Sequence, residues 1–278
     1  SRACFYLSTA KLNRVLEHAW ADMTVTVEAG CTFGVLQATL AEHGQRLTAD
    51  PLWPQKATVG GVLATNDTGA LRLMYGGLRD LIIGITLALP DGTLAKSGGK
   101  VVKNVAGYDL MKLATGALGT LGVITQATFR VYPLPRESRS FTARFANPAA
   151  AGEFVVRVLA EPLAITSMQV RGAEVDILIE GTQAGIAAQH KRIREFGKAE
   201  PSDASIFQAR QKLWDKPGAI AKISVVPSKI AEFANADAVF QATGIGWMRV
   251  SGGLAALRSR VVAAGGSLTV LRPDANDP

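Results

Sequence analysis

Small and hydroxyl-bearing residues around a pair of glycines form the first segment that could do chemistry. Gly60 and Gly61 follow Thr58 and Val59 within the Gly-rich segment 57–69. Because glycine has no Cβ, another molecule could lie directly on this backbone. Free N–H groups at a helix that begins at Gly60 would bind a phosphate. A helix packed tightly against a sheet, or a plain turn, would use the same residues. The segment is neither a Walker A loop nor a Gly-x-Gly-x-x-Gly motif.

A second glycine pattern lies closer to the middle of the chain. Gly116, Gly119 and Gly122 recur every three residues. Such a repeat could wrap around a flat ligand, with the backbone of Val123 and Ile124 presenting N–H and C=O groups to it. The alternative is a loop that leads into a strand and needs positive φ angles. Spacing by itself favours the loop.

Histidine, cysteine and serine patterns do not indicate metal or nucleophile chemistry. The histidines His18, His43 and His190 lie far apart, and no HxxxH, HxH or HExxH motif is present. Cys4 and Cys31 do not form a CxxC pair, which excludes a zinc ribbon or a disulfide scaffold. The Gly-x-Ser-x-Gly motif of a nucleophile elbow is also absent. We expect no metal site, and the sequence identifies no catalytic base.

Composition and charge narrow the class of protein. Of 278 residues, 48% are hydrophobic, which excludes wholesale disorder. No apolar run reaches the roughly 18 residues of a membrane helix, and the first residues lack the apolar region of a signal peptide. The net charge of +7 is mild, and only 6% of residues are aromatic, so nucleic-acid binding is not indicated. Because cysteine is scarce, a reducing cytoplasm is the simplest compartment.

The elements that would position the glycines lie before residue 135. β-Branched and apolar runs predict strands at 24–29, 81–89, 93–97 and 123–132, with a tight turn at 90–92. Thr32 is expected to cap a helix at 33–43, and a short helix follows Asp109. Pro133 and Pro135 then end the last strand and mark a domain boundary.

The chain beyond these prolines follows a different pattern. Strands are predicted at 164–171, 174–180, 219–226, 245–250 and 267–271, and helices at 183–196, 228–236 and 254–263. Residues 197–217 read as a loop-rich insertion. This alternation predicts an α+β sandwich of the split βαβ type. We therefore expect two domains, at 1–135 and 136–278.

Several short motifs together resemble a known family. In order along the chain they are Pro54-x-x-Ala57-Thr58-Val59-Gly60-Gly61, Tyr75-Gly76, Arg79-Asp80, Pro90-Asp91-Gly92, Gly107-Tyr108-Asp109-Leu110 and Gly116-x-x-Gly119-Thr120-Leu121-Gly122. Their order and spacing resemble the flavin-binding domain of the vanillyl-alcohol-oxidase/PCMH type over about residues 20–135. Within that family, the motif at 103–109 is most similar to the FAD-binding E subunits of glycolate oxidases.

The resemblance implies an α+β fold in which a PCMH-type FAD-binding domain at 1–135 precedes an α+β, ferredoxin-like cap domain at 136–278. The family's Gly-rich pyrophosphate loop would precede Leu7, so the first flavin subdomain is expected to be mostly missing and the second mostly present. The implied cofactor is non-covalent FAD. Its implied contacts are Asp50 and Pro51 at the ring system, Thr58, Val59, Gly60, Gly61 and Ala64 along the flavin and pyrophosphate, Gly69 and Gly76 where the chain passes closely, and Gly122, Val123 and Ile124 at the isoalloxazine edge.

The resemblance also implies a function. The chain would be the FAD-binding subunit of a glycolate (2-hydroxy acid) dehydrogenase or oxidase complex, in which a small 2-hydroxy acid gives a hydride to the flavin or electrons pass through this subunit. Its implied partners are a larger flavoprotein subunit and an iron–sulfur subunit, in the cytoplasm or at the inner membrane through those partners. One alternative is a stand-alone FAD-dependent D-lactate-type dehydrogenase, which would need a histidine cluster in the cap. Another is a flavin-free scaffold subunit.

Overall fold

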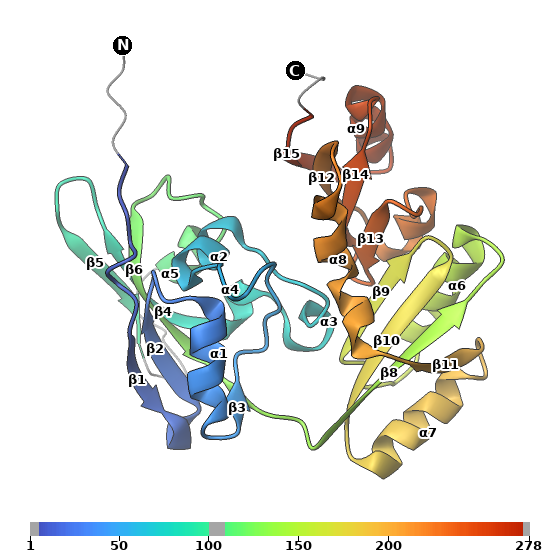
Figure 1. Ribbon diagram of the computed structural model, residues 1–278, viewed down its shortest axis with the longest axis horizontal. Helices are drawn as coiled ribbons and strands as arrows, with labels where there is room; N and C mark the ends of the chain where they lie inside the picture. Colours follow the sequence, from blue (N-terminus) through green and yellow to red (C-terminus); the bar gives the residue numbers. More distant parts are fainter. Residues whose placement is uncertain (1–5, 100–108, 275–278) are drawn as a thin grey trace. The chain divides into compact units, whose positions relative to one another are not determined.

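The computed structural model describes residues 6–99 and 109–274. Compact packing divides the chain into unit 1, Ser1–Gly69 with Tyr75–Leu134, and unit 2, Ala70–Met74 with Pro135–Pro278. Figure 1 follows the chain through both units. Of the motif at 103–109 only Asp109 falls among the described residues, so the rest of that motif lies outside them.

Unit 1 is built on a five-stranded antiparallel sheet in the order β1-β2-β6-β4-β5. Its strands are β1 (Val15–Ala19), β2 (Thr24–Glu28), β4 (Ile82–Ala88), β5 (Leu94–Gly98) and β6 (Val123–Arg130). A separate pair joins β3 (Gln45–Arg46) to β7 (Tyr132–Pro133). The predicted strands and the turn between β4 and β5 are confirmed, and Gly92 in that turn has φ +85°.

Four short helices add buried residues to the core of unit 1. They are α1 (Phe33–Ala41), α2 (Val59–Thr65), α4 (Leu78–Leu81) and α5 (Leu110–Ala114). The 3₁₀-helix η1 (Trp20–Asp22) links β1 to β2, and α3 (Arg72–Tyr75) lies largely in the segment Ala70–Met74 of unit 2. The predicted cap of α1 is confirmed, because Thr32 Oγ1 accepts a hydrogen bond from Val35 N. Leu36 and Leu63 join Phe129 in one fully buried core.

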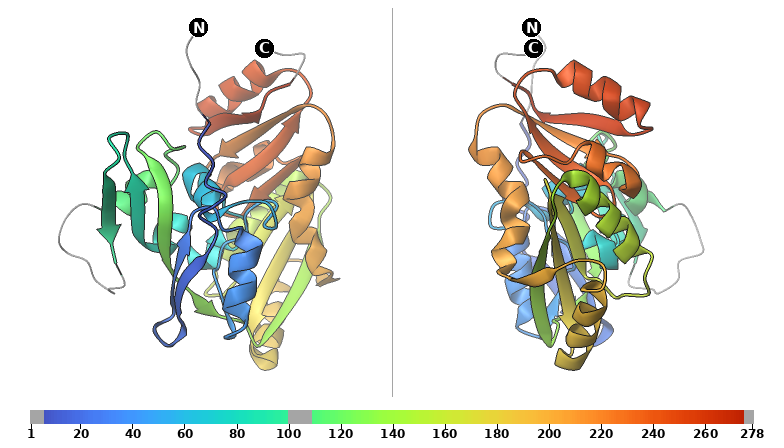
Figure 2. Two further views of the ribbon diagram at one scale, coloured as in Figure 1. Left: turned by 60° about the vertical axis from the view of Figure 1, so that its left-hand side comes forward. Right: turned by 90° about the vertical axis from the view of Figure 1, so that its right-hand side faces the viewer.

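Unit 2 contains one eight-stranded antiparallel sheet in the order β11-β8-β10-β9-β13-β14-β12-β15 (Figure 2). Its strands are β8 (Glu137–Arg144), β9 (Ser167–Arg171), β10 (Glu174–Gly181), β11 (Ala199–Ser202), β12 (Ala219–Ser224), β13 (Ala238–Gln241), β14 (Ile245–Val250) and β15 (Ser267–Arg272). Its helices are α6 (Pro148–Leu159), α7 (Gln183–Ile193), η2 (Ala204–Gln208), α8 (Ala209–Lys212), η3 (Leu213–Asp215), η4 (Pro227–Glu232) and α9 (Leu254–Ala263).

The split βαβ prediction is confirmed twice over. The first repeat runs β8-α6-β9-β10-α7-β11, and the second runs β12-η4-β13-β14-α9-β15. Each repeat gives the same order of strands within the sheet, and the pairing of Phe240 in β13 with Val170 in β9 joins them edge to edge. Neighbouring residues in a strand point to opposite faces. Ile223 therefore enters the large core under α6, α7, η4 and α9, whereas Ile220 enters a small core that contains Leu213 of η3.

One sequence prediction for unit 2 is wrong. Residues 197–217 are not a loop-rich insertion, since they contain β11, η2, α8 and η3. The helix predicted at 228–236 is present as the 3₁₀-helix η4 (Pro227–Glu232), which ends earlier than predicted. Strand β8 was not predicted; its residues Glu137–Arg144 mix charged, small and aromatic side chains, and the strand is held by pairing with β10.

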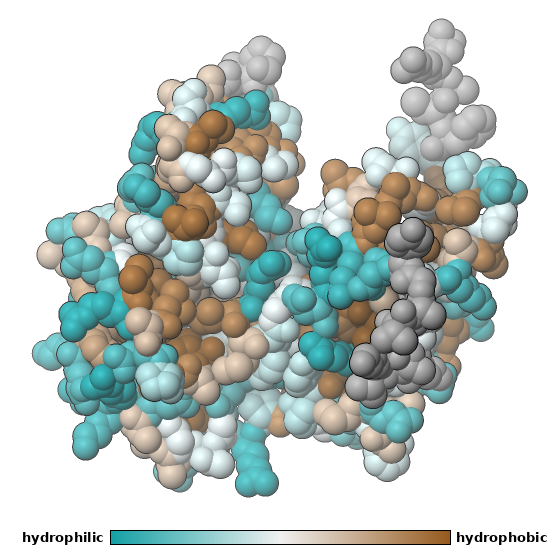
Figure 3. Space-filling view, turned by 180° about the vertical axis from the view of Figure 1, so that it is seen from behind, coloured by the Kyte–Doolittle hydropathy of each residue, from teal (hydrophilic) through white to brown (hydrophobic). Residues whose placement is uncertain are grey.

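The described surface mixes hydrophilic and hydrophobic side chains over both units (Figure 3). Within residues 6–99 and 109–274, every helix is too short or too polar to cross a membrane.

Candidate functional site

The first turn of α2 is tied into the protein by its own backbone. Val59 N donates to Cys31 O at 2.9 Å and Gly60 N donates to Ala29 O at 2.7 Å. Gly61 N donates to the hydroxyl of Thr58, the N-cap, at 3.2 Å. The prediction of free N–H groups at Gly60 is therefore wrong, because long-range acceptors take them.

Gly60 instead permits close packing. A Cβ at this position would lie 2.8 Å from the Cβ of Ala29 and 3.0 Å from its carbonyl oxygen. Real Cβ atoms do not approach other atoms this closely without a shift in the structure. The interpretation of Gly60 as a residue of a tightly packed helix is confirmed.

The opposite side of α2 is open and lined by small residues. Gly61 is exposed, while Thr58 and Ala64 are half-buried. Positions 58, 61 and 65 recur at helical spacing, and Thr65 is also exposed. Val62 and Leu63 face the core, and Ala64 lies at the edge of the open side, where it is half-buried and packs partly against the core. The side of α2 formed by Thr58, Gly61, Ala64 and Thr65, called the α2 face below, therefore lets a flat ligand approach the backbone.

The loop at 116–122 borders the α2 face at its carboxyl end. Gly116 N donates to Leu63 O and Leu118 N donates to Ala64 O, both at 2.9 Å. Gly116, Gly119 and Gly122 have φ angles of +83°, +75° and +147°. The interpretation of this repeat as a loop with positive φ is confirmed, and wrapping around a flat ligand stays a prediction.

A pair of carboxylates joins the segment at 50–52 to the segment that follows α2. Asp50 Oδ1 accepts from Gly69 N at 2.8 Å, and Asp67 Oδ2 accepts from Leu52 N at 2.7 Å. A Cβ at Gly69 would lie 2.1 Å from Asp50 Oδ2. The absence of a side chain at Gly69 thus makes room for the Asp50 carboxylate, and the role of Gly69 beside the flavin stays a prediction. The hydrogen bond between Asp50 and Gly69 is called the Asp50–Gly69 clamp below. Pro51 lies between Asp50 and Leu52, which make these two hydrogen bonds, and is buried.

Two buried polar atoms near these segments lack hydrogen-bond partners among the described residues. They are Asn66 Oδ1 and Thr48 Oγ1. Asn66 ends α2 in the left-handed region, with φ 49°. A Cβ at Gly116 would lie 3.3 Å from the Asn66 Cβ, so the 116–122 loop covers Asn66 closely. An unsatisfied buried polar group costs about 1–3 kcal/mol.

The remaining predicted site residues have other local roles. Gly76, with φ +77°, forms a turn in which Asp80 Oδ2 accepts from Gly77 N at 2.8 Å. Ile124 is buried in the core of unit 1, and Val123 pairs with Ala88 at the start of β6. The structure therefore places Thr58, Gly61 and Ala64 together on α2, with Gly122 beside Ala88 of β4, and it packs Val59, Gly60 and Ile124 toward the protein interior.

Cys31, His18 and His43 make contacts elsewhere in unit 1 and are not part of the α2 face. Cys31 is 1% exposed, and its Sγ lies 3.5 Å from Thr32 O. Burial, with the nearby Glu28 carboxylate, raises the pKa of the Cys31 thiol. His18 Nε2 is 2.8 Å from Gln45 Oε1, and the His43 ring stacks on Trp20. Cys4 lies outside the described residues.

Known proteins match this chain in sequence and in fold. Residues 1–98 match the family described as an FAD binding domain. The match confirms FAD as the cofactor. Alkyldihydroxyacetonephosphate synthase has a similar structure, with a TM-score of 0.69 at 17% identity, over 94% of this chain and 63% of that one. The expected PCMH-type FAD-binding fold of mixed helix and sheet is thereby confirmed.

Curated relatives carry related names. Glycolate oxidase subunit GlcE of Escherichia coli is 30% identical over 73% of this chain and 58% of its own length. D-lactate dehydrogenase of Archaeoglobus fulgidus is 35% identical over 63% of this chain and 40% of its own length. Glycolate oxidase subunit GlcD of Bacillus subtilis is 32% identical over 61% and 36%. The chain thus spans between about one third and three fifths of the length of these relatives.

Proposed function

We propose that this chain, which carries a PCMH-type FAD-binding domain, is the FAD-binding subunit of a complex that oxidises a small 2-hydroxy acid such as glycolate. The observation that carries the proposal is the α2 face. That face is lined by small residues and bordered by the 116–122 loop. The similarity to glycolate oxidase subunits supports the substrate class.

The chain's own residues would hold FAD mostly by backbone. Gly61 and Ala64 let the flavin lie on α2, and Gly122 keeps the start of β6 free of side chain. Asn66 Oδ1 and Thr48 Oγ1 would accept hydrogen bonds from N–H or hydroxyl groups of the cofactor. The clamp between Asp50 and Gly69 fixes the chain beside them. FAD, when bound, supplies a hydride acceptor.

Attachment of the cofactor would be non-covalent. The thiol of Cys31 is buried with a raised pKa, which keeps it protonated and unreactive. His18 forms a hydrogen bond with Gln45, and the His43 ring stacks on Trp20. Partners in the complex would be a larger flavoprotein subunit and an iron–sulfur subunit, and the complex would work in the cytoplasm or at the inner membrane through them.

A stand-alone D-lactate-type dehydrogenase is the second candidate, favoured by the 35% identity to an archaeal D-lactate dehydrogenase. A dehydrogenase of that type would need a histidine cluster in the cap. In unit 2 the sequence has one histidine, His190, and its ring stacks on Phe141.

Purification through a tag on this chain, from the cells that make it, tests the proposal. We expect a complex with flavin and iron–sulfur absorbance whose flavin is bleached anaerobically by glycolate. A chain that purifies alone and is bleached by D-lactate would favour the second candidate. A colourless chain that still holds a partner would contradict both and support a flavin-free scaffold.

A further inference from the structure

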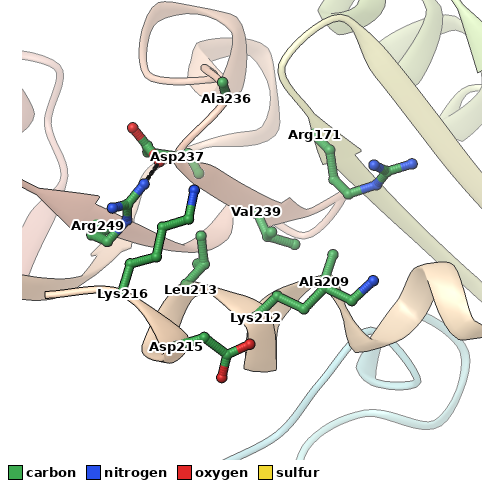
Figure 4. Close-up of a pocket in the computed structure, with 11 residues that line it drawn as sticks. Arg171, Ala209, Lys212, Leu213, Asp215, Lys216, Ala236, Asp237, Val239 and Arg249 are labelled. Carbon is green, nitrogen blue, oxygen red and sulfur yellow. Dashed lines mark hydrogen bonds and ion pairs between the residues drawn. The ribbon is translucent and has the colours of Figure 1, made fainter.

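Unit 2 contains a pocket of its own, with a volume of about 640 Å³. It lies between the ends of β9, β13 and β14 and the α8–η3 segment (Figure 4). Ligand pockets for small molecules typically measure about 300–1,000 Å³. Every lining residue belongs to unit 2, so the pocket does not depend on the proposed flavin chemistry.

One end of the pocket carries a net positive charge. Arg249 forms an ion pair with Asp237, and its backbone N–H also donates to Asp237 O at 2.8 Å. The Lys216 side chain extends toward this pair (Figure 4). The Lys216 carbonyl oxygen accepts a hydrogen bond from Arg272, but the Lys216 Nζ makes no ion pair or hydrogen bond with the described residues. Two cations and one carboxylate therefore leave this end with an excess of one positive charge.

The other end is positive as well, and its arginine is held rigidly. Arg171 Nε and Nη2 donate to the fully buried Asp176 carboxylate at 2.6 and 2.9 Å. Asp176 also accepts from Thr142 Oγ1 and Gln169 Nε2, both at 2.9 Å. Such bidentate bonds fix the plane of the guanidinium group. They leave Arg171 Nη1 without a partner in the described part of the chain.

Lys212 supplies the second free cation of that end. Its side chain points to the same side of the pocket as Arg171 (Figure 4), and it too has no partner among the described residues. Glu174 bonds both Arg171 and Arg144. The positive charges of Arg171 and Arg144 are therefore balanced by the negative charges of Asp176 and Glu174. Lys212 gives this end of the pocket one positive charge in excess.

Apolar side chains separate the two charged ends. Leu213 and Val239 are 7% and 4% exposed and form the wall between them, with Ala209 beside Lys212. Asp215, the remaining carboxylate of the lining, points away from the space between the lysines (Figure 4). A compact anion such as phosphate would meet cations at only one end, whereas a longer ligand could reach both.

We propose that this pocket binds a linear aliphatic dicarboxylate. One carboxylate lies against Lys216 and Arg249, and the other against Lys212 and Nη1 of Arg171. The methylene groups between them pack on Leu213 and Val239, where burial of apolar surface favours binding. Charge-assisted hydrogen bonds at the two ends give the site its preference for two carboxylates over one.

Calorimetric titration of the full chain tests the proposal with adipate, hexanoate and inorganic phosphate as probes. Because hexanoate lacks the second carboxylate, we expect it to bind roughly tenfold more weakly than adipate. Lys212→Gln and Lys216→Gln should each lower the adipate affinity roughly tenfold and abolish the preference for adipate over hexanoate. Both lysines are exposed, so the fold should survive, which circular dichroism would verify.

Lys191→Gln on α7 is the matched control, since Lys191 is exposed and does not line this pocket. It should leave adipate binding unchanged. The proposal would be overturned by absence of adipate binding at millimolar concentration, by phosphate binding as tightly as adipate, or by an equal loss in the Lys191 variant.

Discussion

The backbone N–H of Gly60 donates a 2.7 Å hydrogen bond to the carbonyl oxygen of Ala29. This bond joins the first turn of α2 to the segment after β2 and takes an N–H that a phosphate would otherwise need. As a result, only the side of α2 that carries Gly61 and Ala64 is free for a ligand. Gly60 and Gly61, adjacent in sequence, therefore have opposite roles.

Alanine at each glycine should separate these roles. Gly60→Ala places a Cβ against Ala29 and should lower the free energy of unfolding by about 1–3 kcal/mol. Gly61→Ala meets only the Thr58 hydroxyl, at 3.1 Å, and gains helix propensity, so its effect should stay below about 1 kcal/mol. Urea unfolding measures both, and equal losses would show that Gly60 is not specially packed.

The clamp between Asp50 and Gly69 predicts a non-additive pair. Gly69→Ala should destabilise the protein strongly, because its Cβ would overlap the Asp50 carboxylate. Asp50→Ala removes a hydrogen bond to Gly69 N and should cost about 1–2 kcal/mol. In the double variant the overlap is gone, so its loss should be smaller than the sum of the two single losses. A double-mutant cycle by thermal unfolding would measure this coupling, and simple additivity would refute the clamp.

Glu28 should make the stability of the protein depend on acidic pH. Hydrogen bonds from the Arg14 side chain and backbone lower the pKa of this buried carboxyl. Its contribution is therefore complete above the ordinary glutamate pKa of about 4.3 and is lost as the pH falls through the lower folded-state pKa. Unfolding at a series of pH values should show this loss, and Glu28→Gln should flatten it. Glu137→Gln, which changes a more exposed carboxyl, should leave the acid slope unchanged.

Asn66 should matter more for the cofactor than for the fold. Gly is the natural replacement because Asn66 adopts φ 49°. Since Asn66 Oδ1 has no partner within the described chain, Asn66→Gly should leave the unfolding free energy within about 1 kcal/mol of the parent. FAD affinity should fall roughly tenfold with the lost acceptor. An unchanged affinity would remove Asn66 from the site.

Local patterns in the sequence predicted several elements closely. The helix at 254–263 and the strand at 245–250 coincide with α9 and β14. Thr32 as a cap and the positive φ angles of the 116–122 glycines also follow from residue type, because caps and left-handed turns are local. The doubling of the split βαβ unit was not predicted, because β8, α6, β11 and β13 were not recognised in the sequence. Strand β8, for example, carries few β-branched residues and is held by its pairing with β10.

The parts of the site that sequence reasoning missed depend on long-range contacts. From the sequence, Gly60 is expected to begin a helix with a free N–H. In the structure this N–H donates to the carbonyl oxygen of Ala29, which is distant in sequence. Asn66 looked like an ordinary residue of a Gly-rich segment, although asparagine after an apolar helix is a signal for the left-handed conformation. Its orphaned oxygen follows from the approach of Gly116, which spacing does not reveal.

The most direct test compares FAD binding to the parent chain, Gly61→Leu and Gly185→Leu. Gly185 of α7 is a matched control, because its N–H donates to the N-cap Thr182 hydroxyl at 3.2 Å as that of Gly61 does to Thr58. Gly61 is exposed and Gly185 is half-buried. After desalting, we expect flavin absorbance in the parent and in Gly185→Leu, and none in Gly61→Leu. Equal retention of FAD by both variants, or no retention by the parent with FAD in excess, would contradict the α2 face as the flavin site.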